Sequence, residues 1–191
     1  RITEAIAAFQ RAIELKPDYA RAFNNLGIAL LEQGHPAEAE TALLRATELQ
    51  PDYAEAHKNL GLALRNQGRL DEAVATCRRS IALRPDSAEA HNLLGLALIE
   101  RGSPAEAESV LRQAIVLQPH YAEAYGNLGL ALRNRGRRRE AIAAYDKALH
   151  YRPDLAEAHN NRGVALLEED RTTDAVAALQ RAIELKPAYP E

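Results

Sequence analysis

The sequence predicts an all-α protein, a solenoid of one half repeat followed by five full repeats of 34 residues. Two observations lead to this prediction: prolines and glycines recur at a fixed interval, and alanine and leucine dominate the composition. The prolines with this spacing are Pro17, Pro51, Pro85, Pro119, Pro153 and Pro187. Self-similarity at a period near 34 is the signature of a helical array in which each unit covers the apolar face of its neighbour.

The composition supports helices and excludes several other classes of protein. The 191 residues include 38 Ala and 27 Leu but only 2 Phe, 7 Tyr and no Trp, so a β-rich fold is excluded. Charged residues make up 27% and interrupt every long apolar run, so we expect no membrane span and no membrane partner. The net charge of −3 offers no general attraction for nucleic acid.

Each repeat predicts a pair of helices, as residues 54–87 illustrate. The first helix covers 54–67 and ends at Gly68, which can take the left-handed conformation. The second covers 70–84 and ends at Pro85, after which Asp86 is predicted to cap the next helix, with Glu89 three residues on.

The same pattern predicts eleven helices in all: one opening helix over 2–16 and five pairs. The repeats are 20–53, 54–87, 88–121, 122–155 and 156–189, after a half repeat over 1–19. We expect residues 1–191 to form a single domain. Because the chain contains no Met and opens inside a helical pattern, we also expect it to be a piece of a longer protein.

Certain residue types recur at fixed positions of the 34-residue unit. In order they are a large residue, the pair Leu-Gly, a second large residue, Ala, a third large residue, Ala and Pro. In the fourth repeat they are Tyr125, Leu128, Gly129, Leu132, Ala141, Tyr145, Ala148 and Pro153. This pattern resembles the tetratricopeptide repeat (TPR) family over essentially the whole chain. The resemblance implies a right-handed superhelix whose concave groove is lined by the first helix of each pair. The phrase His159-Asn160-Asn161 most resembles the arrays of O-linked N-acetylglucosamine transferases and their bacterial relatives.

The strongest candidate site lies on these first helices. Steps of four, three and four residues place Glu55, Asn59, Leu62 and Asn66 on one helix face. In the transferase arrays an asparagine at one repeat position contacts the backbone of an extended polypeptide, and the resemblance carries this role to four asparagines. The predicted groove residues are Asn25, Asn59, Asn127 and Asn161, with Asn66 and Asn134 further along the face and Leu93 and Leu96 as an apolar step. The alternative is that these asparagines simply solvate the helices.

No residue pattern predicts catalysis, a metal site or a cofactor. Cys77 fills a slot that Leu43 and Tyr145 occupy elsewhere, so we expect it to be buried; a reactive pair with His57 is the alternative. Three histidines share one repeat position, His57, His91 and His159. Stacked repeats would separate them by about 10 Å, which is too far for one zinc ion. The arginines of 133–139 are predicted to form a solvated helix and turn face, with a nucleic-acid contact as the alternative.

We therefore predict a cytoplasmic protein-interaction scaffold, not an enzyme, that binds a protein or peptide. Two alternatives stay open. The chain could be the substrate-docking arm of a glycosyltransferase whose catalytic domain lies beyond Glu191. It could also be a homo-oligomer formed through the solenoid ends, where Ile2, Ile6, Phe9 and Ile13 have no covering helix. Repeats one and three further share the segments 36–40 and 104–108, which suggests duplication of a repeat pair.

Overall fold

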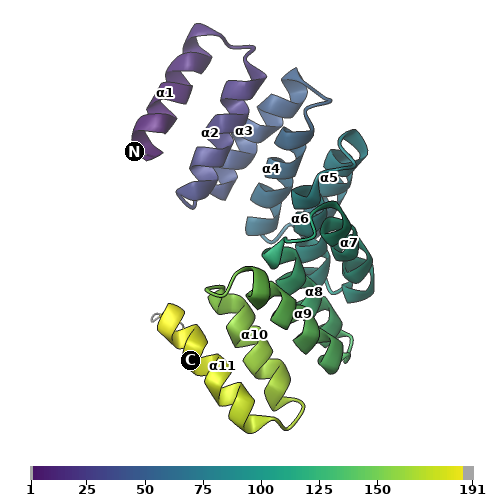
Figure 1. Ribbon diagram of the computed structural model, residues 1–191. Coiled ribbons are helices and arrows are strands. Elements are labelled where there is room, and N and C mark those ends of the chain that lie inside the picture. Colours follow the sequence, from purple (N-terminus) through teal and green to yellow (C-terminus); the bar gives the residue numbers. More distant parts are fainter. Residues whose placement is uncertain (1, 187–191) are drawn as a thin grey trace. The chain divides into compact units, whose positions relative to one another are not determined.

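The computed structural model describes residues 2–186, which form eleven α-helices and no strand (Figure 1). The helices are α1 (Ile2–Leu15), α2 (Ala20–Glu32), α3 (Pro36–Leu49), α4 (Ala54–Asn66), α5 (Leu70–Leu83), α6 (Ala88–Glu100), α7 (Pro104–Leu117), α8 (Ala122–Asn134), α9 (Arg138–Tyr151), α10 (Ala156–Leu167) and α11 (Thr172–Leu185). The predicted all-α class and the eleven predicted helices are confirmed. Pro187 and the end of the fifth repeat lie outside the described residues.

The chain divides into two compact units, Arg1–Ala97 and Leu98–Glu191, with the division inside α6. In the first unit α2 contacts α1, α3 and α4, and α4 also contacts α3 and α5. In the second unit α8 contacts α7, α9 and α10, and α10 also contacts α9 and α11. Each unit therefore alternates first and second helices, as the repeats predict. That residues 1–191 form a single domain stays a prediction.

The predicted helix ends are confirmed, but the predicted aspartate caps are wrong. Gly68 has a φ of +76°, and Gly34, Gly102 and Gly136 are also left-handed. Asp170, which breaks this glycine series, still adopts a φ of 58°. Helix α6 begins at Ala88, and the hydroxyl of Ser87, not the predicted carboxylate of Asp86, accepts a hydrogen bond from the Ala90 N–H at 3.2 Å. Helix α4 begins at Ala54, so its N-cap is Tyr53 and no side chain caps it. Asp52 lies one residue too early, because the turn after each proline is longer than the sequence spacing suggests.

Four of the first helices, α2, α4, α8 and α10, carry a glycine against which the following helix packs a side chain. An ideal Cβ on Gly129 would lie 2.5–2.8 Å from ring atoms of Tyr145, and one on Gly61 would lie 2.5 Å from the Cys77 sulfur. Both Tyr145 and Cys77 are completely buried. The repeated Leu-Gly thus permits two helices to approach so closely that no side chain fits at the glycine position.

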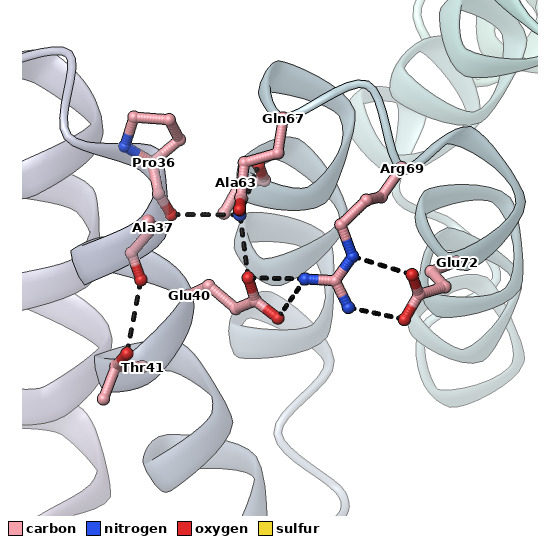
Figure 2. A network of polar contacts seen from close by, with 8 residues as sticks. All are labelled: Pro36, Ala37, Glu40, Thr41, Ala63, Gln67, Arg69 and Glu72. Atoms are coloured by element: carbon pink, nitrogen blue, oxygen red, sulfur yellow. Dashed lines mark hydrogen bonds and ion pairs between the residues drawn. The ribbon is translucent and has the colours of Figure 1, made fainter.

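A polar network joins the first repeat to the second at the turn between α4 and α5. Figure 2 shows Arg69 between two carboxylates: its Nη1 donates to Glu40 at 2.6 and 2.7 Å, and its Nε and Nη2 donate to Glu72 at 2.7 and 2.6 Å. Gln67 Nε2 donates to the same Glu40 at 2.8 Å (Figure 2). The contacts of Arg69 and Gln67 with Glu40 link the second repeat to the first, and the two-nitrogen pairing with Glu72 holds the guanidinium in position for them.

None of the helices between residues 2 and 186 combines the length and the apolar character that a membrane span requires.

Candidate polypeptide-binding surfaces

The predicted groove residues lie on helices that meet side by side in each unit. Helix α2 contacts α4 in the first unit, and α8 contacts α10 in the second. First helices of successive repeats therefore form one continuous surface in each unit. We call these the α2–α4 surface and the α8–α10 surface, and the asparagines fall on both.

On the α2–α4 surface the asparagines bond to one another. Asn59 is 6% exposed, and its Nδ2 donates to Asn24 Oδ1 at 2.9 Å. Asn24 is 1% exposed and donates in turn to Asn25 Oδ1 at 3.3 Å. The side chain of Asn25 is half-buried, whereas that of Asn66 is exposed. Part of the hydrogen-bonding capacity of Asn59 is thus used inside the protein.

Sequence reasoning missed Asn24, which is the central member of this network. Its repeat position holds Lys58 in the second repeat and Gly126 in the fourth, so no periodic signal marks it. The signal that could have found it is that Asn24 lies 35 residues before Asn59, one repeat plus one residue. This offset places two amides opposite each other on adjacent first helices.

On the α8–α10 surface the asparagines of this repeat position are more exposed than Asn59. Asn127 and Asn161 are both half-buried, and Asn134 is exposed. Leu130 and Val164, one helical turn further along, are half-buried as well. The surface therefore combines amide groups with apolar side chains that water still reaches. On α6 the two members of the predicted apolar step, Leu93 and Leu96, are also half-buried.

Two of the glutamates that follow the start of a first helix, Glu89 and Glu123, are paired with cations. Lys58 Nζ lies 2.6 Å from Glu89 Oε2, and this pairing holds the pKa of Glu89 below its ordinary value. Arg152 Nη1 lies 2.7 Å from Glu123 Oε1. The negative charge of these two glutamates is thus balanced within each unit.

Four of the five arginines of the 133–139 segment are held by glutamates. Arg135 and Arg137 both donate to Glu108, and Arg137 also donates to Glu140 at 2.6 and 2.7 Å. Arg138 lies 3.2 Å from Glu168, and Arg139 lies 3.1 Å from Glu169. This local pairing lowers the positive charge that a phosphate backbone would meet. The absence of a nucleic-acid partner stays a prediction.

The three histidines that share a repeat position have backbone partners. His57 and His159 place Nε2 3.0 and 2.9 Å from the carbonyl oxygens of Pro51 and Pro153, and His91 places Nδ1 2.9 Å from that of Ser87. Each ring thus ties a first helix to the loop before it. Within residues 2–186 no three His, Cys, Asp or Glu side chains are grouped to hold a metal ion.

Cys77 is expected to react slowly with thiol reagents in the folded protein. Burial raises the pKa of its thiol to about 12, from an ordinary value of 9.0, so the reactive thiolate is scarce at neutral pH. Labelling followed by absorbance should be at least about a hundredfold slower than in denaturant. Between these two pKa values only the thiol of the unfolded chain ionises, and this ionisation favours unfolding. The stability that the buried neutral thiol contributes is therefore present below pH 9 and is lost as the pH rises towards 12. Rapid labelling at pH 7 would contradict this structure of the Cys77 site.

Together, paired helices with a 34-residue period and exposed polar first-helix surfaces define a helical-repeat protein. The family profile described as tetratricopeptide repeat matches residues 24–88, 79–122 and 127–190, and one described as TPR repeat matches residues 1–34. The chain belongs to the tetratricopeptide repeat family. No curated protein matches it.

Several solved structures share the fold. MamA 41-end from Desulfovibrio magneticus RS-1 is 26% identical, with a TM-score of 0.75 over 90% of this chain and 97% of that one. TTC0263, a thermophilic TPR protein in Thermus thermophilus, is 24% identical, with a TM-score of 0.78 over 88% and 92%. YrrB, described as a TPR protein with an unusual peptide-binding site, is 24% identical, with a TM-score of 0.69 over 95% and 94%. The finer resemblance to O-linked N-acetylglucosamine transferases stays a prediction.

Proposed function

We propose that the chain is a protein-interaction scaffold that binds an extended polypeptide along the first helices of its repeats. The observation that carries this proposal is the α8–α10 surface, where Asn127 and Asn161 stand one repeat apart beside half-buried Leu130 and Val164. An asparagine amide offers two donors and an acceptor, which matches the peptide unit of any sequence. The peptide-binding site for which YrrB is described supports a binding role on this fold.

The spacing of the asparagines suits an extended ligand. Packed helices are separated by roughly 8–10 Å, and an extended chain advances about 3.3 Å per residue. Asn127 and Asn161 would therefore meet peptide units about three residues apart. Side chains between these units would face Leu130 and Val164, so we expect an apolar residue there. Leu93 and Leu96 are proposed to play the same part on α6.

Replacing Asn127 and Asn161 together by alanine is expected to weaken binding by about tenfold, because each lost neutral hydrogen bond costs about 0.5–1.5 kcal/mol. The ligand is the tightest peptide that the 191-residue chain selects from a random display library, and the measurement is its Kd by calorimetry. Asn59 is left unchanged, because its loss would unpair the buried Asn24 amide.

The matched control removes two amides from second helices of the same unit, Gln113 on α7 and Gln180 on α11, both exposed. Binding should be unchanged in this variant, and melting should confirm that both variants fold. An unchanged Kd in the Asn127 and Asn161 variant would show that the peptide binds to another surface. The glycosyltransferase-arm alternative and the cytoplasmic location stay predictions.

A further inference from the structure

The first and last helices are nearly the same helix. Helices α1 and α11 each have 14 residues and differ at four aligned positions: Ile2 and Thr172, Glu4 and Asp174, Ile6 and Val176, Phe9 and Leu179. The polar residues at their C-terminal ends are identical: Gln10, Arg11 and Glu14 match Gln180, Arg181 and Glu184. A surface that accepts α1 is therefore complementary to α11.

Helix α1 is held loosely in the first unit. It contacts α2, and none of its residues is fully buried. Ile6 and Ile13, two turns apart on one face, are only half-buried. Beside this contact lies an open cavity of about 730 Å³, lined by Gln10 of α1, by Phe23, Leu26 and Leu30 of α2, and by residues of α3 that include Leu44. Part of the apolar surface of α2 is thus left uncovered by α1.

Helix α11, in contrast to α1, is held firmly and still exposes apolar side chains. It packs on α10 with one face, which buries Ala175, Ala178 and Ala182. Val176 and Ile183 lie on another face and are 46% and 57% exposed. They occupy the positions that Ile6 and Ile13 hold in α1. Helix α11 therefore presents to solvent the two positions that are half-buried in α1.

We propose that α11 of one copy displaces α1 of another copy and packs on its α2, which joins the two chains head to tail. The displaced helix gives up one half-buried face, whereas the incoming helix is already anchored on α10 and keeps that contact. The template for the new interface is the α1–α2 contact of the structure. Because donor and acceptor surfaces differ, each copy added to an open assembly leaves one surface of each kind free, so the assembly grows with concentration.

Sedimentation velocity of the 191-residue chain over a wide range of concentration tests the proposal. The average mass should rise with concentration. Replacing Val176 and Ile183 together by glutamate should leave a monomer, because both side chains are exposed and only the new interface needs them. The matched control is Val116→Glu on α7, where the side chain is 70% exposed and the association should equal that of the unmodified chain.

Two further measurements distinguish helix exchange from contact between intact ends. Replacing Ile6 and Ile13 by alanine should loosen α1 and shift association to about tenfold lower concentration. In hydrogen exchange, α1 should lose protection and α11 should gain it as the chain assembles. A monomer at all concentrations, assembly of the glutamate variant, or gain of protection in α1 would each overturn the proposal.

Discussion

Replacing Tyr145 by alanine is expected to lower the free energy of unfolding by about 3–5 kcal/mol, the usual cost of deleting a buried aromatic ring. Tyr145 is completely buried in α9, and its ring covers Gly129 of α8 at the contact that joins the two helices of the fourth repeat. Gly129 has no side chain that could fill the space left by the ring. Urea unfolding followed by circular dichroism measures the effect.

Replacing Tyr145 by phenylalanine is the informative control, and it should act in the opposite direction. Among the described residues the buried hydroxyl has no hydrogen-bond partner. Burial also raises the pKa of Tyr145, so the hydroxyl stays neutral and uncharged. Removing an unpaired buried polar group relieves a desolvation cost of about 1–3 kcal/mol, so the phenylalanine variant should be at least as stable as the parent. A clear loss of stability would mean that the hydroxyl is bonded.

Replacing Glu108 by glutamine is expected to cost about 1–3 kcal/mol, because it breaks a buried ion pair whose arginines still reach water. The side chain of Glu108 is 3% exposed and accepts from Arg112, Arg135 and Arg137, which are 33–52% exposed. It joins α7 to the turn after α8, as Glu40 does in the first unit. Without the carboxylate the three guanidinium groups repel one another.

The effect of this change should depend on pH. Burial favours the neutral form of Glu108, but the hydrogen bonds from Arg137 and Arg135 and the charge of Arg112 outweigh it, so its pKa lies below the ordinary 4.5. A lowered pKa contributes stability that is full above pH 4.5 and is lost as the pH falls through the folded value. The difference between parent and variant should therefore shrink in acid.

Glu40→Gln is the matched control for Glu108, because Glu40 occupies the same position two repeats earlier. Its side chain is 16% exposed and pairs with Arg69 alone among arginines of the described residues. We expect a smaller loss than at Glu108. Equal losses at the two positions, or a Glu108 effect that does not change between neutral and acid pH, would contradict the role assigned to the three arginines.

The sequence by itself determined the repeat length, the eleven helices and their ends. These features depend on local chemistry: a proline cannot continue a helix, and Gly68 can turn left-handed where few other residues can. The burial of Cys77 was also predictable, because its slot holds large side chains in the other repeats. The helix-ending residues recur in successive repeats, so the helix boundaries can be recognised without a structure.

Only the tertiary structure decided which polar groups are paired. The amides of Asn24 and Asn59 meet because adjacent repeats bring together residues 35 apart, and a single helix face does not show this. Glu108 likewise lies 27 and 29 residues before Arg135 and Arg137. The segment 133–139 by itself shows only a basic cluster, whereas in the fold two of its arginines bind one buried carboxylate. The recurrence of segment 36–40 at 104–108 was visible in the sequence. Its physical meaning, a carboxylate that holds the next repeat in place, depends on the packing of helices that are distant in sequence.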